Sequence, residues 1–194
     1  MFSPRELGLE RGWPGRIDGD RVVQLAAQTL QAFFTGGGES REHAVFPLDD
    51  VALRAPVLHP PAVRIFDAPD EFAFANPSAI LGPGESVPNV GDLEAHARVT
   101  AIIGMEAIGG YTLMAEVRAR GLGAPKDRDF ALCLGPVVET ELETEFDFEA
   151  AHALAARNTR LYPGDLLAAP AHEVLPVGDV SYEGIGALRN PVAQ

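Results

Sequence analysis

The sequence predicts an α+β fold in which β-structure predominates. Apolar runs of strand length, such as residues 99–104 and 130–134, recur along the chain and are separated by turns rich in Gly and Pro. Two segments, residues 25–34 and 148–156, have the composition of short helices. A parallel α/β sheet would need a helix between most of its strands, so we expect a mainly β domain with few helices.

The N-terminal region begins with a predicted β-hairpin over residues 15–25. Asp18-Gly19 lies between two short apolar strands and is a signal for a type I′ turn. The helix predicted over residues 25–34 ends at three consecutive glycines, residues 36–38, which stop a helix and begin a flexible loop.

A further strand is predicted from Val51 to Ala55, where apolar residues alternate with others. Pro56 ends this strand, and an extended linker with two more prolines follows. We therefore expect residues 1–60 to form a small N-terminal subdomain and residues 61–194 to form a second, larger domain.

The charge of the chain excludes two classes of partner. The formal net charge is −13, and the basic residues do not cluster. Nucleic acids and anionic membranes are bound by clustered cations, so we expect neither as a partner. The negative charge is explained most simply by solubility.

Several features indicate a cytoplasmic protein. No apolar run reaches eighteen residues, and the first fifteen residues contain no apolar segment typical of a signal peptide. The single cysteine, Cys133, cannot form an intramolecular disulfide, which fits a reducing compartment. It lies in the apolar run FALCLG, so we expect a buried structural thiol rather than a nucleophile.

Seven segments, taken together and in order, resemble the fumarylacetoacetate hydrolase family. Together they contain 85 of the 194 residues and are spread over residues 51–192. In chain order they are VALRAPVLHPPAVRIF (51–66), PSAILGPGE (77–85), LEAHARVTAIIG (93–104), GYTLMAEVRAR (110–120), KDRDFALCLGPVVET (126–140), LYPGDLL (161–167) and GDVSYEGIGALRNPV (178–192).

The resemblance implies a mixed β-roll that is usually a homodimer, with residues 61–194 as the catalytic-type domain. Members of this family act on small 2-oxo acids or β-dicarbonyl acids by C–C bond hydrolysis, decarboxylation or isomerisation. A Mg²⁺ or Mn²⁺ ion on three carboxylates holds the substrate, and hard cations of this kind prefer anionic oxygen ligands.

At the metal-binding positions this chain departs from the family pattern. The two glutamates of the family's E-x-E motif correspond to His96 and Arg98, and its aspartate corresponds to Glu116. Arginine has no acceptor lone pair and stays charged, so Arg98 cannot ligate a metal and places a cation where one should bind. We expect that no metal is bound in the usual way. A shifted metal site from Glu94, His96 and Glu116 is an alternative that the charge of Arg98 opposes.

The substitutions leave two interpretations of the site. In one, Arg98 replaces the metal and, with Lys126 and Asp129, binds a small anionic oxo acid, while His96 acts as a general base. Lys126 is the only lysine and matches the family's active-site lysine. In the other, Arg98 forms an ion pair with Glu116 or Glu94 and fills an obsolete cavity.

The segment before residue 77 favours loss of catalysis. The family carries a His and a Glu on a lid there, whereas this chain has only DAPDEFAFAN (67–76), without a histidine. The hypotheses are therefore a metal-independent enzyme on a 2-oxo or β-dicarbonyl acid, or an inactive protein that binds a small anion or serves as a partner subunit. We expect a homodimer or a heteromer with a related subunit.

Overall fold

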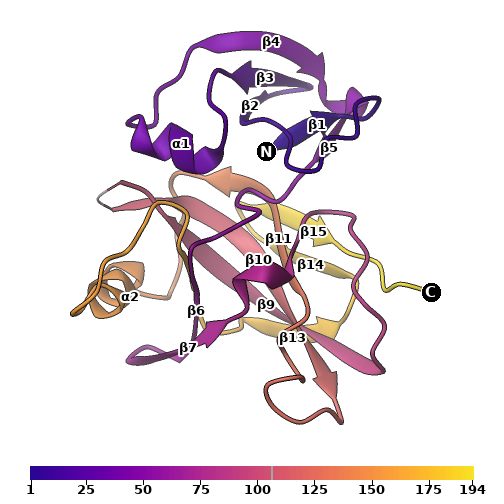
Figure 1. The fold of residues 1–194 in the computed structure, drawn as a ribbon, viewed down its shortest axis with the longest axis vertical. Coiled ribbons are helices and arrows are strands. Elements are labelled where there is room, and N and C mark those ends of the chain that lie inside the picture. The colour runs from indigo at the N-terminus through magenta and orange to yellow at the C-terminus, as the bar shows by residue number, and fades with distance from the viewer. Residues whose placement is uncertain (106) are drawn as a thin grey trace.

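Strands dominate the computed structural model, which describes residues 1–105 and 107–194. The N-terminal elements lie above the main sheet in Figure 1. They comprise β1 (Phe2–Pro4) paired with β5 (Val51–Leu53), a three-stranded sheet of β2 (Gly15–Asp18), β3 (Arg21–Leu25) and β4 (Glu42–Pro47), the helix α1 (Leu30–Thr35) and a 3₁₀ turn (Leu48–Asp50). The division of the chain at residue 60 stays a prediction.

The predicted hairpin is present, but its turn is of another type. Asp18 pairs with Arg21, so the two loop residues are Gly19 and Asp20. Gly19 has φ +61°, whereas Asp20 is not among the residues with positive φ. A type I′ turn needs positive φ at both positions, so this turn matches type II′, which places glycine first.

The first helix is shorter than the sequence predicts. It begins at Leu30 rather than Leu25, because the Thr29 side chain accepts a hydrogen bond from the Ala32 amide and caps the helix there. Its C-terminal cap is Gly36, at the start of the glycine triplet as predicted.

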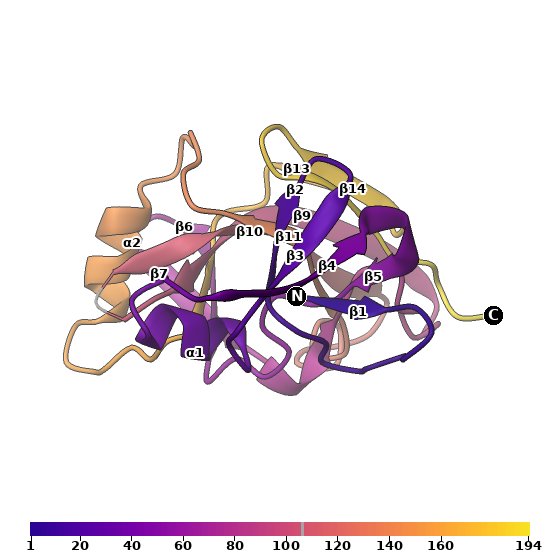
Figure 2. The ribbon, with the colours of Figure 1, turned by 90° about the horizontal axis from the view of Figure 1, so that it is seen from above.

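The main sheet contains eight strands and curls as mixed sheets do (Figures 1 and 2). Its hydrogen-bonded order is β7-β6-β12-β9-β10-β11-β8, and β13 pairs with β9 outside this path. The strands are β6 (Val63–Ala68), β7 (Glu71–Ala75), β8 (Ile80–Leu81), β9 (Asp92–Ile103), β10 (Ile108–Arg120), β11 (Leu132–Glu139), β12 (Leu166–Ala168) and β13 (Glu173–Pro176). The mainly β fold class is confirmed.

Alternating residues of β9 explain how one strand serves both a core and a polar site. The residues at odd positions, from Ala95 to Ile103, are buried in the larger hydrophobic cluster. On the opposite face Ile102 belongs to a second apolar cluster, but the same face is polar from Thr100 through Arg98 toward the start of the strand. The polar residues of β9 thus lie directly beside the hydrophobic core.

The larger core is covered by α2 (Phe148–Ala155), which is capped by Asp147, and by the hairpin of β14 (Asp179–Tyr182) and β15 (Gly186–Arg189). Figures 1 and 2 place α2 at the opposite side of the molecule from the C-terminus. Cys133 of β11 is buried as predicted, and burial raises the pKa of its thiol to about 12. No described helix is long and apolar enough to span a bilayer.

Candidate functional site

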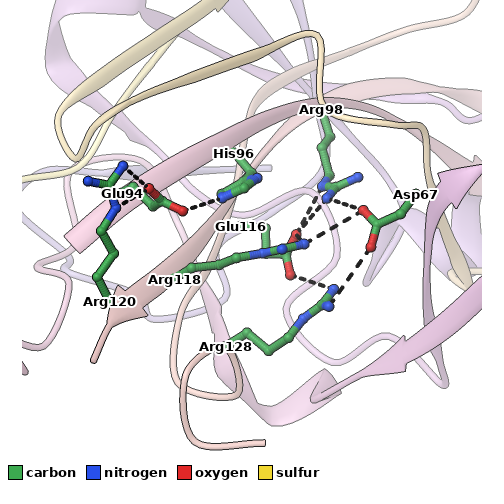
Figure 3. Close-up of polar contacts among 8 residues, drawn as sticks. All are labelled: Asp67, Glu94, His96, Arg98, Glu116, Arg118, Arg120 and Arg128. Atoms are coloured by element: carbon green, nitrogen blue, oxygen red, sulfur yellow. Dashed lines mark hydrogen bonds and ion pairs between the residues drawn. The ribbon is translucent and has the colours of Figure 1, made fainter. Parts of the chain in front are cut away.

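The paired strands β9 and β10 bring the altered metal-ligand positions to one face of the sheet. His96 lies directly opposite Glu116, and Glu94 lies opposite Arg118. Side chains two residues apart on a strand point to the same face, so Arg98 joins this group as the diagonal neighbour of Glu116. The sequence-predicted residues His96, Arg98, Glu94 and Glu116 are therefore together in space (Figure 3).

Arg98 is buried, at 1% exposure, and each of its three nitrogens lies within 3.1 Å of an oxygen. Its Nε donates to Oε2 of Glu116, and Nη1 donates to two backbone carbonyls, those of Phe66 and Ala169. Its Nη2 donates to Oδ1 of Asp67 at 2.7 Å. A buried charge is tolerated when it is paired and hydrogen-bonded in this way.

Glu116 is buried, and three guanidinium groups surround its carboxylate. Oε2 accepts hydrogen bonds from Arg98 and, at 3.1 Å, from Arg118. Oε1 lies 2.7 Å from Nη2 of Arg128, in a geometry that makes the contact an ion pair rather than a hydrogen bond. Both oxygens are therefore occupied by cations of the protein itself.

This donor set does not fit a divalent cation. A Mg²⁺ or Mn²⁺ ion on Glu116 would have to displace the guanidinium of Arg98 and withstand repulsion from Arg118 and Arg128. Among residues 1–105 and 107–194, no three His, Cys, Asp or Glu side chains converge in an arrangement that could hold a metal.

Asp67 is the second carboxylate of this cluster, and a β-bulge orients it. Phe66 pairs with Phe72 and Ala68 pairs with Glu71, which leaves Asp67 without a partner on β7. A bulge of this kind redirects the side chain of the extra residue. Burial alone would raise the pKa of Asp67, but the hydrogen bond from Arg98 and the charges of Arg98, Arg118 and Arg128 hold it below its usual value.

Three guanidinium groups share two paired carboxylates in this cluster. Ion pairs within 4 Å join Arg98, Arg118 and Arg128 to the carboxylates of Asp67 and Glu116 (Figure 3). A third carboxylate, that of Asp127, acts on Arg118 through its charge without forming an ion pair within 4 Å. The side chains of Arg118 and Arg128 are 24% and 26% exposed, so these two guanidinium groups are partly open to solvent.

A second polar group adjoins this cluster along β9. Nε2 of His96 lies 2.9 Å from Oε1 of Glu94, and Oε2 of Glu94 accepts a hydrogen bond from Arg120 at 2.6 Å. The hydrogen bonds from His96 and Arg120 lower the pKa of Glu94. Glu94 thereby fixes the orientation of the imidazole, which is the arrangement that holds a histidine for proton transfer.

Lys126 and Asp129 lie on the loop between β10 and β11, and they bind each other. The Lys126 ammonium is 2.7 Å from Oδ2 of Asp129, and the lysine side chain is 76% exposed. No described contact joins Lys126 to Arg98. Arg128 of the same loop instead reaches Glu116.

Three other members of the site escaped the sequence interpretation. Arg118 could have been found, because it lies two residues after Glu116 on the same strand face. Arg128 stands between Lys126 and Asp129 in the family-like segment, but loop geometry decides which of these side chains points inward. Asp67 carried no signal, since the bulge that orients it depends on the pairing of β6 with β7.

The family-like segments that this chain retains are structural. Nδ2 of Asn190, from the NPV segment, donates to the carbonyls of Gly82 and Glu85, and Glu85 accepts from the Gly82 amide. These bonds join the C-terminus to the GPGE turn. In the PGD turn, Oδ2 of Asp165 accepts from the Tyr162 amide and from the buried Arg64.

The two described cavities lie elsewhere, beside the N-terminal elements. One of about 670 Å³ is lined mainly by apolar side chains, including Phe33, Phe34 and Val138. The other, of about 360 Å³, is lined by residues that include His59 and Gln31. Neither is lined by a member of the arginine cluster, so the cluster is defined by its charge and contacts rather than by a hollow.

Sequence comparison finds no family profile and no curated protein that matches this chain. Structure comparison finds clear relatives in fold. Maleylpyruvate hydrolase from Sphingobium sp. SYK-6 is 20% identical, with a TM-score of 0.76 over 95% of this chain and 97% of the enzyme. The 5-carboxymethyl-2-hydroxymuconate delta-isomerase from Mycobacterium smegmatis is 21% identical, with a TM-score of 0.75 over 93% and 94%.

A third similar structure is 2-hydroxyhepta-2,4-diene-1,7-dioate isomerase from Mycobacterium marinum, at 20% identity and a TM-score of 0.73 over 92% of both chains. The maleylpyruvate hydrolase has also been solved with manganese(II) and pyruvate. The fold implied by the resemblance in sequence, that of fumarylacetoacetate hydrolase-type enzymes, is therefore confirmed.

Proposed function

We propose that this chain is a divergent relative of the fumarylacetoacetate hydrolase family that binds a small 2-oxo acid or other carboxylate without a divalent metal. One observation carries the proposal: the buried guanidinium of Arg98 lies on Glu116, where the resemblance places the metal among its carboxylates. A fixed protein cation thus stands in for the ion.

Charge and geometry support an anionic ligand. A guanidinium recognises a planar carboxylate through paired hydrogen bonds, and Arg118 and Arg128 present such groups at the partly exposed side of the cluster. Three guanidinium groups are paired within 4 Å with only two carboxylates of the described residues, Asp67 and Glu116, and this favours an anion there. Lys126, on the loop that carries Arg128, adds an exposed cation that is paired with Asp129.

A second candidate function is catalysis on the same class of ligand. It is favoured by the contact between Glu94 and His96, which fixes an imidazole next to Glu116. In that case Arg98 would stabilise developing negative charge on a bound oxo acid and His96 would move the proton. The reaction would be C–C bond hydrolysis, decarboxylation or isomerisation. As an inactive binder, the chain could also serve as one subunit of a homodimer or of a heteromer with a related chain.

Ligand-dependent thermal stability tests the proposal. A ligand that binds only the native state raises the midpoint of unfolding, so oxalate in EDTA should stabilise the purified protein, and oxalate with Mn²⁺ in place of EDTA should have no larger effect. The double variant Arg118→Gln/Arg128→Gln should lose the stabilisation. Arg16→Gln is the matched control, because Arg16 forms an exposed ion pair with Glu42 in the N-terminal sheet.

The outcomes separate the alternatives. Stabilisation that appears only with Mn²⁺ would overturn metal-independent binding, and no stabilisation under any condition would overturn anion binding at this site. Catalysis is tested by following the enol absorbance of a 2,4-dioxo acid during C–C cleavage. Activity that His96→Gln abolishes while oxalate binding is retained would support the enzyme.

A further inference from the structure

The position of Asp67 in the arginine cluster suggests what a ligand must do to enter it. Its Oδ1 lies 2.7 Å from Nη2 of Arg98 and 3.6 Å from Nη2 of Arg118, and its Oδ2 lies 3.9 Å from Arg128. One carboxylate thus lies among all three guanidinium groups that the proposed ligand would use (Figure 3).

We propose that Asp67 occupies the carboxylate subsite of this protein and that a small dicarboxylate enters by displacing it. This inference rests on the proposed function and names the ligand class of the same site. Displacement leaves Glu116 as the one carboxylate, among the described residues, that forms ion pairs within 4 Å with the three guanidinium groups. A planar dianion such as oxalate then brings two carboxylates to these groups, whereas a monocarboxylate only replaces the one that Asp67 supplied.

The two carboxylates of the cluster differ in the way this exchange requires. Glu116 is fully buried in the middle of β10 and is held by cations on both oxygens. The Asp67 side chain is 50% exposed and stands on a bulge next to the turn between β6 and β7. Moving the carboxylate of Asp67 into solvent therefore costs little free energy, whereas moving Glu116 would leave the Arg98 charge buried without that partner.

The backbone around Asp67 permits the movement. Because Asp67 has no residue opposite it on β7, its side chain can leave the cluster without breaking a pair of the ladder. Arg98 keeps its bonds to Glu116 and to the carbonyls of Phe66 and Ala169, so its guanidinium stays in place and exposes one Nη2 donor. The position that Asp67 leaves therefore already holds one of the two donors that a bidentate carboxylate needs.

Calorimetric titration of the full-length protein with oxalate at constant ionic strength tests the inference. Asp67→Asn removes the competing charge while keeping the size of the side chain. Its oxalate affinity should exceed that of the wild type by roughly tenfold. This is the gain expected if Asp67 leaves the subsite free in only about a tenth of the wild-type molecules. Acetate should bind both proteins much more weakly than oxalate does.

Asp70→Asn is the matched control. Asp70 is an exposed residue in the same turn, and it makes no described contact with the cluster. The substitution changes the net charge equally, so it should leave the oxalate affinity within about twofold of the wild type. An equal gain in Asp70→Asn and Asp67→Asn would assign the effect to net charge and overturn displacement.

The titrations also separate a failure of oxalate binding from a failure of Asp67 displacement. If neither wild type nor Asp67→Asn binds oxalate, the proposed function fails, and this inference fails with it. If the wild type binds and Asp67→Asn binds equally or more weakly, only displacement of Asp67 is overturned.

A measurement on the wild type keeps the inference testable if Asp67→Asn does not fold. The carboxyl ¹³C signal of Asp67 reports its titration by NMR. Saturating oxalate should raise the pKa of Asp67 toward its ordinary value, because its guanidinium partners are then occupied. A pKa that stays depressed in the complex would show that Asp67 remains in the cluster and would overturn the proposal.

Discussion

The Nε atom of Arg98 lies 3.0 Å from Oε2 of Glu116, across two neighbouring strands and out of contact with solvent. The pair lies diagonally across the ladder, since Arg98 is opposite Met114 and Glu116 is opposite His96. Arg98 is thus the buried partner of the Glu116 carboxylate, beside the partly exposed Arg118 and Arg128, and the stability and the ligand chemistry of the site both depend on this pair.

Breaking this pair from either side should destabilise the protein strongly. Arg98→Met leaves Glu116 buried with fewer partners, and Glu116→Leu leaves the Arg98 charge buried without its carboxylate. Each should cost about 3–5 kcal/mol in urea unfolding, whereas the double variant should cost less than the sum of the two. Arg16→Gln, which breaks an exposed pair, should change stability by less than about 1 kcal/mol. Additive losses in the double variant would show that the two residues are not coupled.

Restoring carboxylates at the altered positions should create a metal site. In the double variant His96→Glu/Arg98→Glu, two new carboxylates join Glu116 on one face of the sheet. We expect Mn²⁺ to raise the unfolding midpoint of this variant but not that of the wild type. At a Mn²⁺ concentration one hundred times its dissociation constant, the free energy of unfolding of the variant should increase by about 2.7 kcal/mol.

Arg41→Glu/His43→Glu is the control for this experiment. Both residues are exposed, and the substitutions change charge and spacing in the same way at a distance from the cluster. An equal response of the control to Mn²⁺ would indicate nonspecific binding. A comparable response of the wild type would show that the existing carboxylates already hold the ion.

The contribution of Asp67 to stability should depend on acid pH. Its pKa is lowered in the folded protein from an ordinary value of 3.8, so the unfolded chain binds the proton first as the pH falls. The stabilisation is thus fully present well above pH 3.8 and is lost as the pH falls through the lower folded pKa. Urea unfolding at pH 7 and at pH 3 should show a stability difference between wild type and Asp67→Asn that shrinks in acid. A difference that is constant with pH would contradict the ion pair.

Asn190 should matter for stability although it is remote from the arginine cluster. Asn190→Ala removes the hydrogen bonds to the carbonyls of Gly82 and Glu85, and Gly82 keeps only a 3.2 Å bond from the Glu85 amide, so we expect a loss of about 1–3 kcal/mol. Asn89→Ala, at an exposed site in the neighbouring loop, should have little effect. Unchanged oxalate binding by folded Asn190→Ala would confirm that the NPV segment supports the fold and not the site.

The sequence by itself determined the fold and the identity of the altered ligands. The Gly and Pro turns and the short apolar runs specify strands and their ends through local backbone preferences, which are properties of a few adjacent residues. For this reason the hairpin at residue 19, the helix after Asp147 and the buried strand that follows Arg98 were predictable. Strand alternation likewise places His96 and Arg98 on one face.

Only the tertiary structure decided which charges meet. Arg98 is neutralised by Asp67, thirty-one residues earlier, and by Glu116, eighteen residues later, and these separations have no local signature. Loop conformation turned Arg128 toward Glu116 and left Lys126 to Asp129 in the solvent. Electrostatic energy depends on distances between side chains that long-range pairing sets, so the sequence could name the residues of this site but not its arrangement of charge.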